Sequence, residues 1–454
     1  MTDLILGVFR GTCSAAILTL VACSGAEEST APPSVILISL DTLRYDHCGF
    51  NGYERDTTPF LDEFSKQCVV FDRAYTTMSW TLIAHMSMVT GLYPTQHGVM
   101  EAELALSPGF PTLAERLAGE GYTNLGVHYP GWLDRRFGFG RGFGTYENAN
   151  DAVEAGRELE VALEGVRAGW PYFMFVHLFD IHSGDLVGPS STMYNPPAPY
   201  DDMFMEGASE LLAGMDMKAW WEAPAAPSKA QEEAVTALYD GGIRYLDSTL
   251  EEWFATWEDR GLLDNTIIII TSDHGEGLRQ RLARFGGHGD LNEEGLRIPM
   301  MVRLPGGARG GERVDSLVSL VDIVPTVLEL VNLEPDVRLP GRSLLGAPRP
   351  PEEWVFAARS NIRAAMRRDR KVIYRDQTPA LVYDLVEDPE ELAPLSPSSD
   401  RARFLAEGTA LLDEALGQLG GYFEPPSARE VGELDEATRN NLKALGYGGE
   451  VGGD

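Results

Sequence analysis

Three continuous apolar runs stand out along the chain, and each has the length of a β-strand. They span 34–40, 173–179 and 266–271, and they are rich in Val, Ile, Leu and Phe. Short runs without polar alternation are typical of parallel strands that are buried on both faces. Weaker strand patterns occur at 124–128 and 298–303.

Helical patterns lie between these runs, at 59–67, 82–90, 112–119 and about 228–261. Alternating strand and helix predicts an α/β fold with a central, mostly parallel sheet flanked by helices.

Polar residues follow each strong strand at the point where it ends. Asp41 follows the first run, Asp180 and His182 follow the second, and Asp273 and His274 follow the third. In open α/β sheets, ligands bind at the carboxyl ends of the strands. We therefore expect these side chains to form one site.

The pattern changes after about residue 345. Residues 347–353 are rich in Pro and charge, and strand-like segments follow at 354–359, 371–375 and 380–385. With a predicted helix near 400–419, they indicate a C-terminal subdomain over 350–425, a small antiparallel sheet plus helix. A catalytic domain over 34–345 precedes it, and a polar tail over 426–454 follows.

Residues 185–227 read as an insertion into the catalytic domain. Gly, Pro, Ser and Met are abundant there, and Trp220 and Trp221 are adjacent. One interpretation is a loop with a helical lid packed on the domain. The other is an aromatic wall for an apolar or sugar-bearing substrate.

Composition narrows the class of partner. The chain has 454 residues, 44% of them hydrophobic, and a formal net charge of −32. That hydrophobic content fits a globular chain, and the charge argues against a nucleic-acid-binding face, which needs a basic stripe. An enzyme for anionic esters would have to supply positive charge locally, and metal ions are the obvious source.

The N-terminus has the pattern of an export signal. Arg10 precedes an apolar run at 13–22, and the segment ends Leu-Val-Ala-Cys-Ser with Cys23. This ending resembles a bacterial lipoprotein signal over 1–23, followed by a linker over 24–33. We expect an exported protein of the cell envelope, periplasmic or on the outer surface, with a membrane tether through Cys23. An ordinary signal peptide or a short membrane anchor is the alternative, although the run is short for a span.

Two of the four cysteines, Cys48 and Cys68, lie in the predicted catalytic domain. In an exported protein they could form a disulfide. Two buried thiols are an equal alternative.

The segment from Ser79 to Pro94, which contains Thr81 and ends in Thr90-Gly91-Leu-Tyr-Pro, resembles the nucleophile segment of the sulfatase branch of the alkaline phosphatase superfamily. Tyr383-Asp-Leu and Glu387-Asp-Pro resemble the closing segment of sulfatase C-terminal subdomains. The resemblance extends from Ser34 to about Leu392 and implies an alkaline-phosphatase-like fold.

The nucleophile segment departs from the sulfatase pattern. Sulfatases carry a Cys or Ser followed by x-Pro-x-Arg and oxidise it to formylglycine. Counting back from Thr90-Gly91, that position holds Thr81, and the Pro and Arg positions hold Ile83 and His85. The stretch 126–130 also lacks the Lys of the family's Gly-Lys-Trp-His segment. A Thr cannot become formylglycine, so these departures point to different chemistry.

Asp41, Asp273 and His274 match the family residues that bind the metal holding the nucleophile. Sulfatases usually carry two adjacent Asp at the first position, whereas Asp41 is followed by Thr42. Two carboxylates with an imidazole favour a divalent transition metal such as Zn or Mn, with Ca or Mg as alternatives. Alternatively, Asp41 and Asp273 only cap helices.

Asp180, His182 and His288 match the second-metal ligands of phosphodiesterase members of the superfamily. A two-metal site stabilises both the attacking and the leaving oxygen. The alternative is that His182 and His288 only hydrogen-bond the bound ester. The resemblance thus implies one or two divalent ions.

Thr81 is the candidate nucleophile and also a candidate ligand of the first metal. It precedes the predicted helix, and a helix N-terminus favours anionic oxygens. Thr81 could instead be a simple N-cap, and Ser79 could compete for either role. His85 lies one turn further on the same face. It could contact the ester, act as acid for the leaving group, or simply pack.

We therefore expect an exported, metal-dependent sulfatase-like hydrolase that cleaves phosphate mono- or diesters, or related esters, through Thr81. The substrate would be an anionic ester of a small molecule, glycan or lipid. Alternatives are an arylsulfatase-like sulfuric ester hydrolase, a phosphoglycerol or phosphoethanolamine transferase, and a non-catalytic binding protein. The sequence indicates no oligomeric state.

Overall fold

The computed structural model describes residues 31–167, 169–183, 193–213, 228–278, 291–334, 336, 338–375 and 381–395, with 402–403, 406–407, 410 and 429–430. Several predicted features lie outside these residues. They are the signal segment with Cys23, most of the linker, Trp220 and Trp221, His288, most of the predicted helix near 400–419, and the tail beyond 430. Residues from Ala31 onward belong to one compact unit.

A nine-stranded sheet forms the centre of this unit, in the order β10-β2-β9-β7-β1-β6-β4-β5, with β8 paired to β2. Strand β1 pairs in parallel with both β6 and β7, whereas β9 is antiparallel to its neighbours. The strands are β1 (Ser34–Leu40), β2 (Val69–Tyr75), β4 (Thr123–His128), β5 (Thr145–Asn148), β6 (Tyr172–Leu178), β7 (Thr266–Thr271), β8 (Arg297–Ile298), β9 (Met300–Arg303) and β10 (Arg313–Ser319). The predicted mostly parallel α/β sheet is confirmed.

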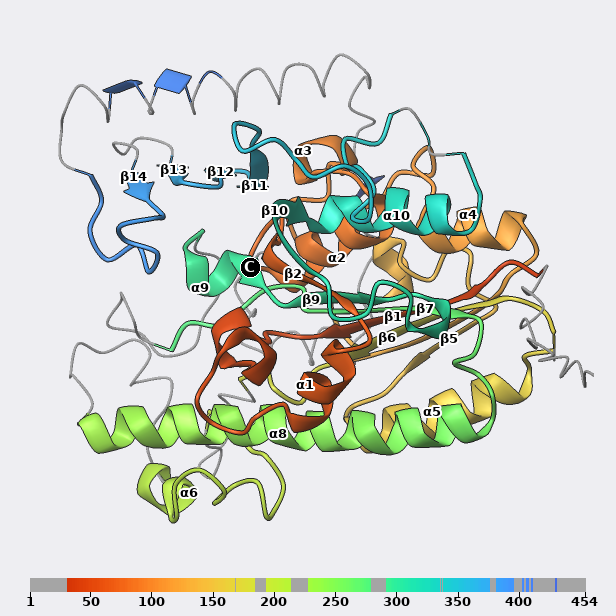
Figure 1. The fold of residues 1–454 in the computed structure, drawn as a ribbon, viewed down its shortest axis with the longest axis horizontal. Helices are drawn as coiled ribbons and strands as arrows, with labels where there is room; N and C mark the ends of the chain where they lie inside the picture. The colour runs from red at the N-terminus through yellow and green to blue at the C-terminus, as the bar shows by residue number, and fades with distance from the viewer. Residues whose placement is uncertain are drawn as a thin grey trace, which may run out of the picture. The chain divides into compact units, whose positions relative to one another are not determined.

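Helices cover both faces of the sheet (Figure 1). One face carries α2 (Thr81–Thr90), α4 (Leu113–Gly119) and α10 (Ile323–Leu330). The other carries α1 (Pro59–Ser65), α5 (Ala152–Glu164) and α8 (Lys229–Asp259). Strand β1 shows why both faces are apolar, because Val35 and Leu37 join the core on the α2 side while Ile36 and Ile38 join the core on the α8 side. Short helices complete the set: α3 (Pro94–His97), α6 (Ala208–Leu212) and α9 (Glu293–Leu296).

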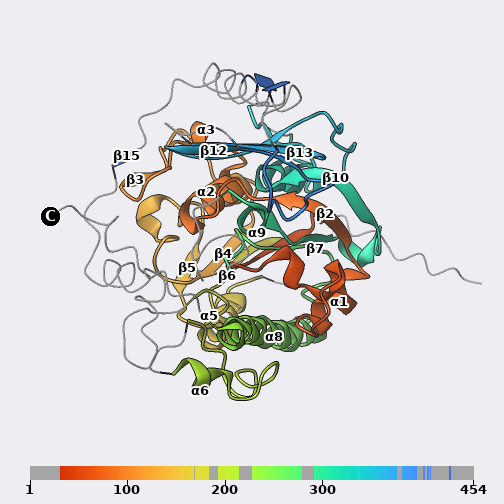
Figure 2. The ribbon, with the colours of Figure 1, turned by 90° about the vertical axis from the view of Figure 1, so that its left-hand side faces the viewer.

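A four-stranded antiparallel sheet forms the C-terminal part, in the order β11 (Val355–Arg359), β12 (Ile362–Arg367), β13 (Arg370–Arg375) and β14 (Leu381–Asp384). It lies beyond α2, on the side away from the central sheet (Figure 2), and Val355 and Ala364 extend the core on that side. A separate two-stranded ladder pairs β15 (Arg429–Glu430) with β3 (Leu104–Ala105). The predicted small antiparallel sheet is thus present, with β12 as a strand that the sequence pattern did not reveal.

A buried ion cluster joins this C-terminal part to the central unit. The Nζ atom of Lys371 on β13 lies 2.8 Å from Glu391 Oε1 and 3.1 Å from Glu293 Oε1. Tyr75 donates its hydroxyl to the other oxygen of Glu293, and Lys371 is fully buried. Each carboxylate therefore has a partner in a place where an unpaired charge would be costly.

The two thiols are free and buried. Cys48 Sγ donates to the carbonyl oxygen of Arg44, and Cys68 Sγ donates to that of Phe64. Of the two alternatives, the structure has the pair of buried thiols. The described part of the insertion, 193–213, includes α6, whose Ala208 and Leu212 join the core with α8.

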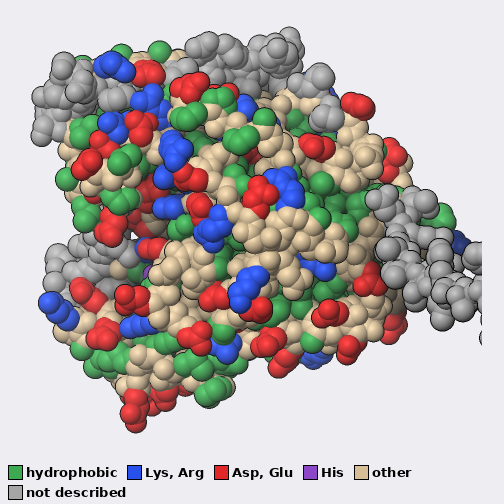
Figure 3. Space-filling view, in the orientation of Figure 1, with side chains coloured by type: hydrophobic (Ala, Val, Ile, Leu, Met, Phe, Trp, Pro, Cys, Tyr) green, Lys and Arg blue, Asp and Glu red, His purple; other side chains and the backbone are tan. Residues whose placement is uncertain are grey.

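The surface agrees with the acidic composition. On the face shown in Figure 3, Lys and Arg side chains of the described residues lie among Asp and Glu and form no continuous basic area. In the part of the chain that the structure describes, no helix has both the length and the apolar character needed to cross a bilayer.

Candidate active site

Adjacent strands bring the first predicted ligand group together. Asp41 follows β1 and Asp273 follows β7, and these strands pair in register with Ser39 opposite Thr271. Ligand atoms of Asp41, Asp273 and His274 all lie within 4.8 Å of one another. All three side chains are fully buried. Residues more than 230 positions apart thus meet because parallel strands end at the same edge of the sheet.

Thr81 lies beside this group at the start of α2. Its Oγ1 is 3.3 Å from Asp41 Oδ2 and 3.3 Å from His274 Nε2. Helix α2 begins at Thr81 itself, with Trp80 at the N-cap position and no side-chain cap. Thr81 is therefore not the N-cap, and its hydroxyl points to the carboxylate and imidazole. Gly91, with a φ of 73°, ends the helix in the left-handed conformation.

The two carboxylates form a candidate cation site. Burial, followed by the charge of Asp273, raises the pKa of Asp41 well above its usual range. Burial also raises the pKa of Asp273. Asp41 Oδ1 and Asp273 Oδ2 are buried and accept no hydrogen bond from the described residues. Two such oxygens next to an imidazole nitrogen suit a divalent ion.

His274 directs a nitrogen lone pair toward the same candidate cation site. Its Nδ1 lies 2.8 Å from the carbonyl oxygen of Gly275, which can only accept, so Nδ1 carries the proton. Burial lowers the pKa of His274 to about 4, so the ring is neutral near pH 7. Its Nε2 is thus free of a proton on the side of Thr81.

His85 is enclosed below Thr81. Its Nδ1 donates to the carbonyl oxygen of Thr81 at 2.9 Å, and its Nε2 lies 2.9 Å from Ser39 Oγ. The ring is fully buried, and burial lowers its pKa. Both nitrogens have partners within the protein, and this geometry supports a packing and positioning role rather than a direct contact with the ester.

Comparison with known proteins identifies the family. The sulfatase family model matches residues 33–333, well over half of the chain. The protein belongs to the sulfatase family. Membership makes the chain an ester hydrolase of the alkaline phosphatase-like superfamily and confirms the resemblance inferred from residues 79–94.

Relatives of this sulfatase-family chain include several kinds of hydrolase. An arylsulfatase of Clostridium perfringens is 23% identical over 86% of this chain and 96% of its own length. A phosphonate monoester hydrolase of Agrobacterium radiobacter has a TM-score of 0.69 at 22% identity, covering 86% of this chain and 96% of that one. A structure in complex with its substrate D-glucosamine-2-N,6-O-disulfate has a TM-score of 0.70 at 18% identity, covering 87% and 99%. The two structures share the fold with this chain.

The second predicted group of the sulfatase-family site is only partly described. Asp180 Oδ1 accepts from the backbone N–H of Ala152, and burial raises its pKa to about 6. His182 Nδ1 donates to Ser183 O, and its ring stacks on Phe179. Neither residue joins the close group of Asp41, Asp273 and His274 within the described residues. His288 lies outside them, so the second metal stays a prediction.

His177 belongs to the site although the sequence analysis did not select it. It lies on β6, and its Nε2 is 2.8 Å from Asp41 Oδ2. The signal was available: His177 is the one ionisable imidazole in the apolar run of β6, three residues before Asp180. A buried polar residue within an apolar strand needs a partner.

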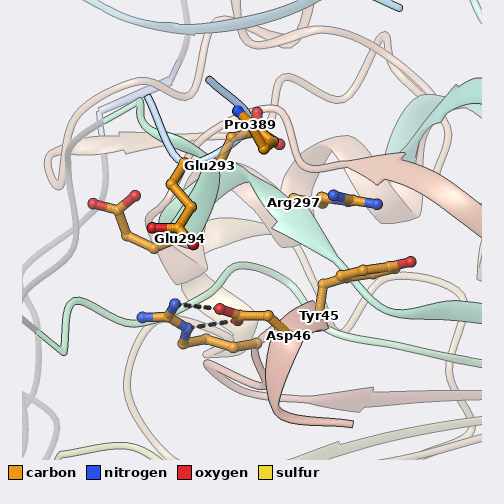
Figure 4. Close-up of a pocket in the computed structure, with 8 residues that line it drawn as sticks. Tyr45, Asp46, Glu293, Glu294, Arg297 and Pro389 are labelled. Carbon is orange, nitrogen blue, oxygen red and sulfur yellow. Dashed lines mark hydrogen bonds and ion pairs between the residues drawn. The ribbon is translucent and has the colours of Figure 1, made fainter. Parts of the chain in front are cut away.

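A cavity of about 300 Å³ is lined in part by the segment that follows Asp41, from Arg44 to Asp46. The Tyr45 and Arg297 side chains stack on one side of it, opposite Glu293 and Glu294 (Figure 4). Arg44 pairs with Asp46 and donates to the carbonyl oxygen of Glu276. This bond ties the segment after Asp41 to the segment after Asp273. The residues that line the cavity are Arg44, Tyr45, Asp46, Glu293, Glu294, Arg297, Pro389 and Glu390.

Proposed function

We propose that this sulfatase-family hydrolase cleaves phosphate mono- or diesters, or related phosphonate esters, through Thr81. The observation that carries the proposal is the place of the Thr81 hydroxyl, 3.3 Å from both Asp41 Oδ2 and His274 Nε2. Thr has no route to formylglycine, so the hydroxyl itself is the available nucleophile. An alcohol becomes an effective nucleophile when a neighbouring group accepts its proton or a metal coordinates it.

The residues present fit a divalent cation. Asp41 Oδ1, Asp273 Oδ2 and His274 Nε2 would hold it, with Thr81 Oγ1 as a further ligand. A bound ion would lower the pKa of the Thr81 hydroxyl and offset the negative charge of the ester. The nitrogen donor and the absence of a second Asp at Thr42 favour Zn or Mn over Ca or Mg.

The protein groups then account for the proton and the phosphoryl oxygens. The Thr81 hydroxyl donates toward Asp41 Oδ2, which is placed to take its proton. The oxygen attacks phosphorus, a bond from Oγ1 to phosphorus forms, and the bond from phosphorus to the leaving oxygen breaks. An aryl leaving group departs as the phenolate, and an alkyl one takes a proton from water. Backbone N–H groups at the start of α2 would face the anionic oxygens of an ester bound beside Thr81. Water then cleaves the phosphothreonine and releases phosphate or a phosphate monoester.

Sulfate esters are the second candidate substrates. The C. perfringens relative is an arylsulfatase that aligns over 86% of this chain, and this observation favours sulfate. Attack of Thr81 on sulfur would use the same proton acceptor. Substrate preference therefore has to be measured with both ester types.

The test is a panel of aryl phosphate monoesters and diesters, phosphonates and sulfates, with metal analysis of the same protein sample. We expect phosphorus esters to be turned over at least a hundredfold faster than sulfates, and Thr81→Ala to abolish turnover while keeping the metal. Mass spectrometry of acid-quenched enzyme should find phosphate on Thr81. Thr95→Ala is the control, because the buried hydroxyl of Thr95 has no hydrogen-bond partner among the described residues.

Two results would contradict the proposal. Full turnover by Thr81→Ala with metal bound would exclude the nucleophile. Preference for the aryl sulfate by orders of magnitude would make the enzyme a sulfatase. An added alcohol acceptor distinguishes hydrolysis from transfer, since a transferase would give an ester product.

We also propose that the protein is exported and tethered to the membrane through Cys23.

A further inference from the structure

His177 lies directly behind Asp41. Strand β6 pairs with β1 with His177 opposite Ser39, so the imidazole stands next to the end of β1. Its Nε2 is 2.8 Å from Asp41 Oδ2, and the ring is 2% exposed. Among the described residues, this is the shortest contact between an imidazole and either Asp41 or Asp273.

The tautomer of His177 follows from its other nitrogen. The backbone N–H of Tyr129 donates to Nδ1 at 3.4 Å. A backbone N–H has no acceptor role, so Nδ1 carries the lone pair and Nε2 carries the proton. The bond to Asp41 therefore runs from Nε2–H to Oδ2. A strand-held imidazole with a defined tautomer can fix the carboxylate plane.

The hydrogen bond from His177 makes the two carboxylate oxygens of Asp41 inequivalent. Oδ2 accepts from His177 and from Thr81, whereas Oδ1 is buried and accepts no hydrogen bond from the described residues. We propose that His177 is a positioning residue that orients Asp41, with Oδ1 toward the cation and Oδ2 toward Thr81. The inference rests on the cation site proposed above.

The neighbouring residues explain why such support is needed. Thr42 replaces the second Asp of the usual sulfatase pair, so Asp41 alone provides the carboxylate after β1. The ring centroid of His85 is 4.8 Å from that of His177. His85 is held by Thr81 and Ser39, and among the described residues no hydrogen bond joins it to Asp41. Groups that hydrogen-bond a metal ligand commonly change metal affinity 10- to 100-fold when removed.

The test uses two substitutions of His177 in the full-length protein. In His177→Asn, the amide oxygen can accept from Tyr129 in place of Nδ1, but the side chain is too short to reach Asp41. In His177→Gln, the longer amide can donate to Asp41 again. The matched control is His97→Asn, because His97 is also fully buried, its Nδ1 also accepts a backbone N–H, from Val99, and its Nε2 meets Ser87 rather than a carboxylate.

Metal affinity is the primary readout, measured with Zn²⁺ and with Mn²⁺ against a chromophoric chelator. We expect His177→Asn to bind metal 10- to 100-fold more weakly. His177→Gln should recover most of the loss, and His97→Asn should match the wild type. At saturating metal, kcat of His177→Asn should fall while KM stays unchanged.

Three results would overturn the inference. One is wild-type metal affinity in His177→Asn, and another is a rise in KM without loss of metal affinity, which would place His177 on the substrate. The third comes from the wild type alone, by ¹⁵N NMR of labelled histidines. His177 must show the Nε2–H tautomer, and the Nδ1–H tautomer would exclude the donor role even if a variant does not fold. If the wild type binds no metal at all, the proposed cation site fails as well, and that result is distinct from the first three.

Discussion

The backbone N–H of Thr42 donates a hydrogen bond to Oδ1 of Asp273 at 3.2 Å. Thr42 reaches this position with a φ of 56°, in the left-handed region that a β-branched residue rarely adopts. Its carbonyl oxygen accepts from the hydroxyl of Tyr239. The turn after β1 thus stores strain on the order of 1–2 kcal/mol to place an N–H donor on a carboxylate of the candidate metal site.

Thr42→Asp should shift the metal preference toward calcium. It restores the second carboxylate of the sulfatase pattern, and Asp tolerates a positive φ better than Thr. Because calcium affinity rises with the number of charged oxygen ligands, we expect a gain on the order of tenfold in Ca²⁺ affinity. Isothermal titration with Ca²⁺ and Zn²⁺ checks this. Thr42→Asn relieves the same strain without adding charge, so an equal gain in that variant would rule out the charge as cause.

Removing metal should lower the melting temperature more at pH 8 than at pH 5. Burial raises the folded pKa of Asp41, so protons compete with the cation as pH falls. The metal-free protein has the opposite pH dependence, because it is stabilised by the proton that buried Asp41 retains. This stabilisation is complete below the pKa of Asp41 in the unfolded chain, and it is lost as pH rises through the higher pKa of the folded protein. At a hundredfold excess over Kd, metal should add about 2.7 kcal/mol. Scanning calorimetry with and without chelator measures both, and an equal loss at the two pH values would contradict the coupling.

His97→Asn should make the free energy of unfolding less dependent on pH below about 6.5. Burial lowers the pKa of His97 to about 3, so between that value and the ordinary one near 6.5 the unfolded chain binds a proton that the folded chain does not. Stability therefore falls as pH decreases below 6.5, by up to about 1.4 kcal/mol per pH unit. Urea unfolding from pH 4.5 to 7 should show a slope smaller by nearly one proton in the variant. An unchanged slope would mean that His97 is protonated in the folded protein.

Lys371→Met should destabilise the protein by about 3–5 kcal/mol, because Glu293 and Glu391 would remain buried without their cation. Urea denaturation at pH 7 measures the loss. Lys66→Met is the control, since Lys66 pairs with Glu63 at the exposed end of α1, where an ion pair contributes little. A loss below about 1 kcal/mol in Lys371→Met would show that the cluster is hydrated or protonated.

Much of the fold follows from local pattern. The apolar runs at 34–40 and 266–271 are strands with those bounds, and the segment 298–303 is divided by Pro299, which cannot donate to a ladder. Strands β2 and β10 were not predicted because Asp72 and Arg73, or Asp315 and Ser316, interrupt their apolar pattern. These strands lie toward one edge of the sheet, where one side of a strand can stay polar.

The residues of the candidate site likewise fall into those that local sequence pattern predicts and those that depend on tertiary structure. Asp41, Asp273 and His274 were predicted because each follows a strand that is recognisable from its own residues. His177 was not, because its role depends on the pairing of β6 with β1, and register is a tertiary property. The burial of His85 likewise depends on Ser39, 46 positions earlier in the chain.

The position of β1 between β6 and β7 has a consequence for folding kinetics. The ligand group exists only after segments near residues 41 and 273 have paired in parallel, and its support by His177 also needs the pairing of β6 with β1. Contacts this distant in sequence form slowly. A cation that needs all of them has no site on the unfolded chain. Metal should therefore leave the refolding rate almost unchanged and slow unfolding, so that resistance to inactivation becomes a kinetic property of the loaded enzyme.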